Sequence, residues 1–186
     1  LEFIEWDEKI TEPLLIEENK QLQISTFSLN HRIPCFGYLF QEKPKDRKLL
    51  SSAIQKYNIP IQFRGRIKQG MDYVQEDGHV IPNNLLTEDA EVPISYAYCS
   101  DNRVKENQLD FLQNTNYLYH EATFTQELLD RAKTTMHSTA FEAASLAKKL
   151  NVDKLLLGHF SARYTDVSPI EKEAKSIFPN SIALKD

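Results

Sequence analysis

YLYHEATF (residues 117–124), MHSTAFEAASLAKKL (136–150) and KLLLGHFSARY (154–164) are the segments that decide the fold of this chain. The first and third begin with short apolar runs typical of buried strands, and the alanine-rich second segment predicts a helix between them. A polar cluster stands at the edge of each element, and these clusters contain Glu121, His137 and His159. Because loops at strand ends commonly carry catalytic side chains, we expect these clusters to converge on one site.

Outward from this stretch, strand-like and helix-like segments alternate, which indicates a layered α/β fold. Ser138 or Thr139 is expected to cap the alanine-rich helix, with Glu142 in a capping-box position, and Asn151 to end it. Strands are expected near residues 14–16, 22–27, 36–40, 94–99, 117–119, 154–157 and 182–184, and further helices at 49–57, 107–114, 126–134 and 169–178.

The composition is that of a single soluble domain. The 186 residues suffice for one core, with 41% hydrophobic and 26% charged residues. No apolar run approaches the roughly 18 residues of a membrane span. The first residues, LEFIEWDEKI, lack both a signal-peptide pattern and an initiator Met, so a fragment or processed chain is expected. Cys35 and Cys99 do not make a disulfide framework, which favours a reducing cytosol and two buried thiols.

Charge is unevenly distributed along the chain. Residues 41–68 carry a net charge of +6 within a total of −5, which leaves −11 for the rest. Such a segment could steer a polyanion, or it could be a solvated loop with ordinary surface lysines. We interpret residues 41–90 as an arm rather than core because its apolar density is low, with a turn-rich excursion at 64–70 and a hairpin at Asp77-Gly78. The eight basic residues of the segment are Lys43, Lys45, Arg47, Lys48, Lys56, Arg64, Arg66 and Lys68.

Three predicted strand ends offer His31, Asp101 and His159. Each taken singly has an ordinary alternative, since histidines are often surface or core residues and an aspartate after a strand often caps a turn. Together, two imidazoles and a carboxylate are a common zinc-binding set, and one carboxylate can bridge two metals. Paired metals stabilise both oxygens of an in-line phosphoryl displacement. At least three further ligands would have to come from elsewhere, because the sequence contains no HxHxDH-type cluster.

The motifs NHRIPCFGY (30–38), YCSDN (98–102), HEATF (120–124), HSTAFEAA (137–144) and GHFSARY (158–164) resemble those of ribonuclease Z, a tRNA 3′-processing endonuclease of the metallo-β-lactamase fold. Their order is that of the C-terminal half of the family. The resemblance implies half of an αββα sandwich over residues 1–186, with a protruding basic arm at 41–90 and the HxHxDH half upstream. It also implies that His31, Asp101 and His159 bind zinc, with Asp101 bridging.

The same resemblance implies that Glu121 and His137 donate a proton to the leaving oxygen. A carboxylate beside His137 would keep it protonated and oriented, although a histidine at a helix start can also simply pack. Ser161 and Arg163 offer phosphate contacts, and Arg64, Arg66 and Lys68 offer contacts to RNA backbone. The intact protein is expected to be a cytoplasmic homodimer that acts on precursor tRNA with two Zn²⁺ per subunit. This chain alone is expected to bind metal weakly or not at all and to be inactive.

Two other functions compete with this one. The first keeps the fold and changes the substrate to another phosphodiester. The second is a non-catalytic module that dimerises or binds RNA through the basic segment.

Overall fold

The computed structural model describes residue 10 and residues 12–184, and it divides into two compact units. The sheet unit contains the described residues of 1–42 and 94–186, and the inserted unit contains residues 43–93. Each unit has its own hydrophobic core. No helix in the described part of the chain is both long and apolar enough to cross a bilayer.

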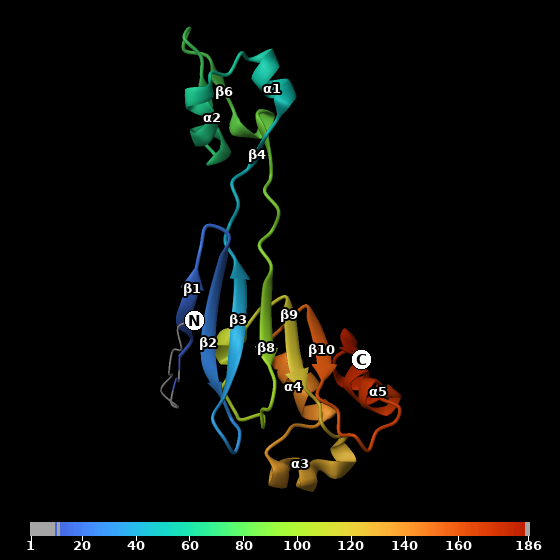
Figure 1. Cartoon of the computed structure of the whole chain (residues 1–186). Helices are drawn as coiled ribbons and strands as arrows, with labels where there is room; N and C mark the ends of the chain where they lie inside the picture. The colour runs from blue at the N-terminus through green and yellow to red at the C-terminus, as the bar shows by residue number, and fades with distance from the viewer. Residues whose placement is uncertain (1–9, 11, 185–186) are drawn as a thin grey trace. The chain divides into compact units, whose positions relative to one another are not determined.

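A seven-stranded sheet forms the centre of the sheet unit, in the order β1-β2-β3-β8-β9-β10-β11. Figure 1 shows β1, β2, β3, β8, β9 and β10 side by side in this order. Neighbours from β1 to β8 pair antiparallel, whereas β8, β9, β10 and β11 run parallel. The strands span β1 (Leu14–Glu18), β2 (Leu22–Leu29), β3 (Cys35–Glu42), β8 (Ser95–Cys99), β9 (Tyr117–Glu121), β10 (Lys154–Gly158) and β11 (Ser181–Ala183).

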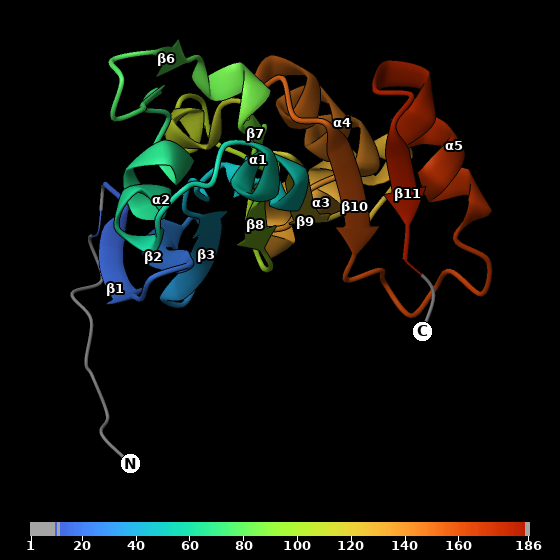
Figure 2. The ribbon, with the colours of Figure 1, turned by 90° about the horizontal axis from the view of Figure 1, so that it is seen from above.

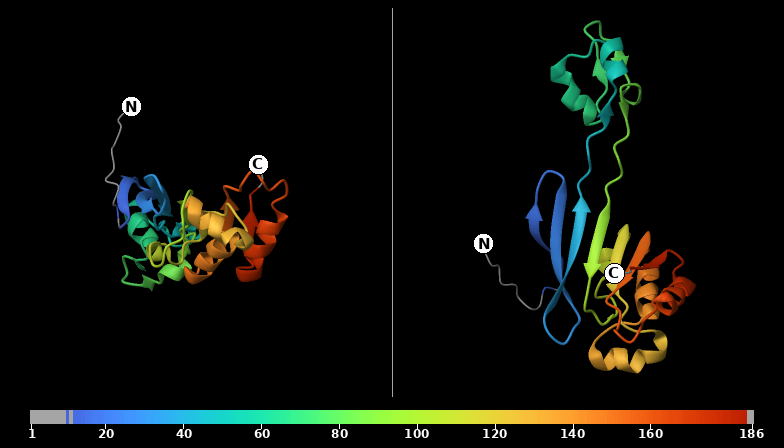
Figure 3. Two further views of the ribbon diagram at one scale, coloured as in Figure 1. Left: turned by 90° about the horizontal axis from the view of Figure 1, so that it is seen from below. Right: turned by 45° about the vertical axis from the view of Figure 1, so that its right-hand side comes forward.

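The helices of this unit are α3 (Leu129–Thr135), α4 (Ala140–Lys149) and α5 (Ser168–Ile177). Helices α4 and α5 pack against each other, and between them they contact β9, β10 and β11 (Figures 2 and 3). Small buried residues (Ala140, Ala143, Ala144 and Ala147) let α4 approach the sheet closely. Thr139 caps α4 with the predicted capping box, because its hydroxyl accepts from Glu142 N and its own N–H donates to the Glu142 carboxylate.

The two faces of the sheet differ. Leu118, Leu155 and Leu157 point into the core that α4 completes. The strand register places Tyr98, Tyr119 and Leu156 on the opposite face, where all three are partly exposed. The Tyr98 and Tyr119 rings stack with centroids 4.7 Å apart. Burial raises the pKa of Tyr119 to about 12, so its side chain is neutral at neutral pH.

The inserted unit corrects two predictions. Residues 64–70, expected as turns, belong mostly to α2 (Ile61–Lys68), whose side chain Ile67 is buried. A Cβ atom added at Gly65, near the centre of α2, would meet open space. The segment interpreted as an arm rather than core has a core of its own, formed by six buried residues: Ala53, Ile59, Ile67, Tyr73, Ile81 and Leu86. Its other elements are β4 (Lys48–Leu49), α1 (Ser51–Lys56), β5 (Tyr73–Val74), β6 (Val80–Ile81), a 3₁₀ turn (Asn83–Leu85) and β7 (Thr87–Glu88).

A third correction concerns residues 107–114 of the sheet unit, predicted as a helix. Only a 3₁₀ turn at Asp110–Leu112 forms there. Asn107 and Asn114 at the ends of this segment adopt positive φ angles of 59° and 61°, which an α-helix does not accommodate. A second 3₁₀ turn, Gln126–Leu128, leads into α3. The predicted strands and the remaining helices form close to their expected positions.

Candidate metal and proton-transfer site

The expected site residues of the sheet unit lie together in space. His31 follows the end of β2, Asp101 follows β8, and His159 comes directly after β10. The His137 ring lies between those of His31 and His159, with ring centroids 5.1 and 5.2 Å away. The edge of the sheet therefore gathers residues that are more than a hundred positions apart in the sequence.

Glu121 is the most heavily bonded side chain of the site. It is fully buried, and its Oε1 accepts from Asn102 N (2.7 Å) and lies 2.8 Å from His137 Nδ1. Its Oε2 accepts from Thr123 Oγ1 (2.6 Å) and from Ser138 N (3.1 Å). Glu121 Oε1 is therefore placed to accept a hydrogen from His137 Nδ1, which leaves Nε2 as the ring nitrogen that does not face Glu121.

Asp101 differs from Glu121 in having an orphaned oxygen. Its Oδ1 is buried and lies 2.9 Å from His159 Nε2, yet it has no hydrogen-bond partner of acceptable geometry among the described residues. A buried oxygen without a partner is costly, and a cation would satisfy it. Potential ligand atoms of Asp101, His31 and Cys35 lie within 4.8 Å of one another, as do those of Asp101, Glu121, His137 and His159. Asp101 belongs to both groups, so the donor set fits a carboxylate shared between two cations.

The backbone constrains His31 and His159, in one case through a carbonyl contact and in the other through an unusual φ angle. His31 Nδ1 lies 2.9 Å from the carbonyl oxygen of Met136, which is exposed by the left-handed turn (φ 61°) that ends α3. His159 itself has φ 56°, an uncommon conformation for a residue other than glycine. Strained backbone of this kind clusters at functional sites. The fold therefore constrains both imidazoles at the edge of the sheet.

Asn102 is a buried residue with several hydrogen-bond partners, and the sequence did not single it out. Its side-chain carbonyl accepts from Asn30 N (2.9 Å), and its amide lies 3.0 Å from His120 Nε2. Burial lowers the pKa of His120, so the ring stays neutral, with Nδ1 donating to the Glu121 carbonyl (2.7 Å). Ser138 donates to the Asn102 carbonyl oxygen. Asn102 thus joins the ends of β2, β8 and β9 to the start of α4.

Arg103 and Cys35 are two further neighbours that the sequence left without a role at the site. Arg103 donates to the carbonyl oxygen of His137 (3.1 Å) and forms a bidentate ion pair with Glu142, the capping residue of α4. The ion pair holds Arg103 in place, and the hydrogen bond from Arg103 in turn holds the backbone of His137. Burial and the negative charges of Asp101 and Glu121 raise the pKa of the Cys35 thiol, which keeps it neutral.

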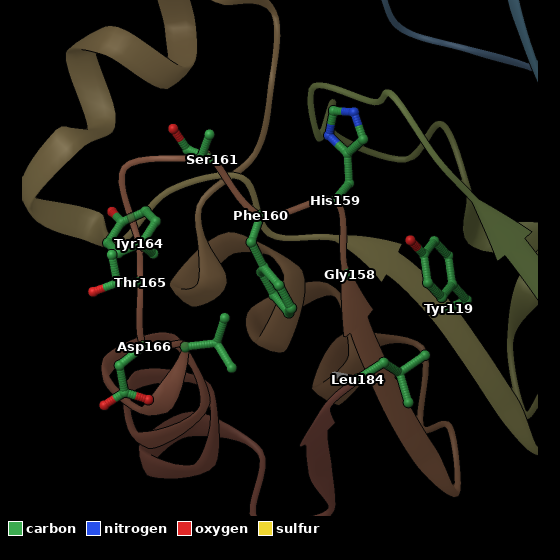
Figure 4. A pocket seen from close by; sticks show the side chains of 11 residues that line it. Tyr119, Gly158, His159, Phe160, Ser161, Tyr164, Thr165, Asp166 and Leu184 are labelled. Atoms are coloured by element: carbon green, nitrogen blue, oxygen red, sulfur yellow. The ribbon is translucent and has the colours of Figure 1, made fainter. Parts of the chain in front are cut away.

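A cavity of about 760 Å³ adjoins His159 (Figure 4). The loop after β10 lines it with Ser161, Thr165 and Asp166, while Tyr119 and Leu184 close another side. Arg163 Nε donates to Ser161 Oγ (3.2 Å), and its guanidinium lies 5.4 Å from the Phe124 ring centroid. The two expected phosphate-binding side chains therefore lie together on the loop that lines this cavity.

The inserted unit offers less free positive charge than residues 41–68 suggested. Counted over residues 43–93, eight basic residues face seven acidic ones. Lys45 pairs with Glu91 (2.8 Å), Arg47 with Asp89, and Lys48 with Glu88 (3.3 Å). Arg64 is also engaged, because its Nε and Nη2 donate to the Ile59 carbonyl (3.2 and 3.1 Å). Arg66 and Lys68 of α2 are exposed.

Solved structures show the class of fold. The metallo-β-lactamase fold protein YhfI from Bacillus subtilis superposes with a TM-score of 0.58, covering 98% of this chain and 53% of its own, at 16% identity. The short form of human tRNase Z superposes with a TM-score of 0.52 over 96% of this chain and 45% of its own, at 20% identity. The chain has the metallo-β-lactamase fold, as its motifs predicted.

Sequence relatives indicate a narrower class of protein than the solved structures do, although no family model matches the chain. Ribonuclease Z of Parabacteroides distasonis is 44% identical over 168 residues, and that of Bacteroides fragilis is 41% identical over 184 residues. These alignments cover 90% and 99% of this chain. The chain is a relative of ribonuclease Z, and the predicted resemblance is confirmed. It spans 55% and 60% of the length of these two proteins.

Proposed function

We propose that the full-length protein is a zinc-dependent endoribonuclease that removes the 3′ trailer of precursor tRNA by phosphodiester hydrolysis. One observation carries this proposal: the buried Glu121 lies 2.8 Å from the half-buried His137, beside the orphaned Asp101 oxygen and His159. A phosphodiesterase needs both parts, namely ligands for a cation that stabilises the phosphate and a donor for the leaving oxygen. The similarity to ribonuclease Z supports the choice of substrate.

His31, Asp101 and His159 would hold the metal, which when bound supplies Lewis-acid stabilisation of the phosphate and an activated water. His137, kept protonated by Glu121, would give its Nε2 proton to the departing 3′-oxygen of the tRNA. Arg163 and Ser161 would orient the phosphate from the loop after β10. Arg103 would hold the His137 backbone in place through its contact to the carbonyl oxygen.

The rest of the protein would complete the site. We propose that this chain is the C-terminal portion of the enzyme and that the remaining ligands and the general base belong to an HxHxDH half outside it. The partly exposed face with Tyr98, Tyr119 and Leu156 would receive a second sheet, giving the αββα sandwich. The intact enzyme would bind two Zn²⁺ per subunit and act as a cytoplasmic homodimer. The chain by itself would then bind metal weakly and be inactive.

The inserted unit would act as the RNA-binding arm. Arg66 and Lys68 are exposed and would contact phosphates rather than bases. Neutralising both should reduce the slope of log affinity against log salt by about 1.4–1.8, because each phosphate contact contributes about 0.7–0.9. Lys45→Gln is the matched control, since Lys45 is already paired with Glu91. Unchanged affinity and slope in the double variant would remove the arm from RNA binding.

The function itself is tested with full-length protein and a precursor tRNA that carries a 3′ trailer. We expect one internal cut that releases the intact trailer, loss of cleavage after chelation, and recovery on addition of Zn²⁺. Asp101→Asn should abolish cleavage and lower the metal content together. Progressive shortening from the 3′ end, or cleavage that survives chelation, would contradict the proposal.

A further inference from the structure

Thr123 joins the two halves of the site through a single hydroxyl. Its side chain is buried, and Oγ1 lies 2.6 Å from Glu121 Oε2, 3.0 Å from His159 Nδ1 and 2.9 Å from the His159 carbonyl oxygen. We propose that Thr123 is a positioning residue that fixes the Nδ1–H tautomer of His159 and so turns the Nε2 lone pair toward Asp101. This inference rests on the proposed role of His159 as a metal ligand.

The number of hydrogens at Thr123 Oγ1 determines the tautomer of His159. A threonine hydroxyl has one hydrogen and two lone pairs, so it can donate to only one of its three neighbours. Glu121 Oε2 is the nearest and carries negative charge, which makes it the strongest acceptor of the three. Oγ1 then has only lone pairs to offer to His159 Nδ1. A favourable contact at 3.0 Å requires that Nδ1 carry the hydrogen.

The hydrogen on Nδ1 of His159 determines the state of the other ring nitrogen, Nε2. With the hydrogen on Nδ1, a neutral His159 has a bare lone pair at Nε2, 2.9 Å from the orphaned Asp101 Oδ1. Two lone pairs that face each other repel in the free protein and attract a common cation. The opposite tautomer would place an N–H toward Asp101 and block ligation. Outer hydrogen bonds of this kind commonly set the tautomer of metal-binding histidines.

The hydroxyl also couples the metal ligand to the proton donor. Glu121 receives its hydrogen bond from Thr123 on the same carboxylate that holds His137 at the other oxygen. Loss of the Thr123 hydroxyl would therefore free the His159 ring and remove one of the four bonds that orient Glu121. A serine at this position keeps the hydroxyl and should keep both functions.

The first test needs no variant. In full-length, metal-free protein with ¹⁵N-labelled histidine, two-bond and three-bond NMR couplings report which ring nitrogen of His159 bears hydrogen. We expect the Nδ1–H tautomer at a pH where the ring is neutral. An Nε2–H tautomer would overturn the inference. This measurement does not depend on catalysis, so it stands or falls separately from the proposed function.

The second test compares Thr123→Val, Thr123→Ser and the matched control Thr125→Val. The Thr125 hydroxyl lies 3.2 Å from Tyr164 Oη. Thr123→Val should weaken Zn²⁺ binding by about 10–100-fold, the usual effect of losing such a partner. Thr123→Ser should restore most of the affinity, and Thr125→Val should leave it unchanged. Far-UV circular dichroism checks that each variant is folded. A folded Thr123→Val variant with wild-type Zn²⁺ affinity and the wild-type tautomer would refute the role of Thr123.

Discussion

Replacing Glu121 by glutamine tests how the buried carboxylate organises the site. All four contacts of Glu121 come from donors, and two of these are the backbone N–H groups of Asn102 and Ser138. An amide has one oxygen, so its NH₂ group must face one of those two backbone N–H groups whichever way it is turned. A buried donor left unpaired costs about 1–3 kcal/mol. The remaining bonds also lose charge assistance, which brings the expected loss of unfolding free energy to at least about 2 kcal/mol.

Urea unfolding of the wild type and Glu121→Gln measures this loss, with the exposed Glu106→Gln as a control expected within about 0.5 kcal/mol. In the full-length protein, Glu121→Gln should also slow single-turnover cleavage by about 10²–10⁴-fold, since the proposed proton donor His137 loses its carboxylate partner. The double variant with His137→Ala should be little slower than either single one, because groups that act as a unit are non-additive. Equal stability of the wild type and Glu121→Gln would refute the hydrogen-bond count.

Three further outcomes are expected. Asp101→Asn should lower the Zn²⁺ content of the full-length protein without lowering the stability of the metal-free form, because Oδ1 has no hydrogen bond to lose; a clear loss of metal-free stability would contradict this. Gly158→Ala should destabilise the fold, since a Cβ atom there would lie 2.3 Å from Tyr119 Oη, and Tyr119→Ala should relieve the penalty in a double-mutant cycle. The buried His120 has a lowered pKa, so below about pH 6.5 the unfolded state binds a proton that the folded state does not, and stability falls with falling pH by up to about 1.4 kcal/mol per unit. His120→Gln should flatten that part of the stability curve, and an unchanged slope would exclude His120 as its source.

Much of the sheet unit is visible in the sequence because local signals and tertiary structure agree there. The apolar runs of β9 and β10, the capping box at Thr139 and the alanine face of α4 each carry a local signature. The inserted unit was harder to predict, since Gly65 and the charges of α2 conceal a helix held by one buried side chain, Ile67.

The candidate site likewise contains residues that the sequence could predict and residues that it could not. Strand ends pointed to His31, Asp101 and His159, because ligand-type side chains at such positions are distinctive. Asn102 and Thr123 gave no comparable signal, since a buried amide or hydroxyl is recognisable only once its partners are placed around it. The ion pairs of the inserted unit were invisible for a related reason. Lys45 and Glu91 are 46 positions apart, and only the fold brings them together.

We propose that His137 supplies a proton to the leaving oxygen while Asp101 holds the metal. The most direct test is cleavage of a precursor tRNA whose bridging 3′-oxygen is replaced by sulfur, which departs without needing a proton. In the full-length protein, this substrate should largely restore the rate of His137→Ala and leave Asp101→Ala inactive. If His137→Ala cuts the sulfur substrate as poorly as the oxygen substrate, His137 is not the proton donor.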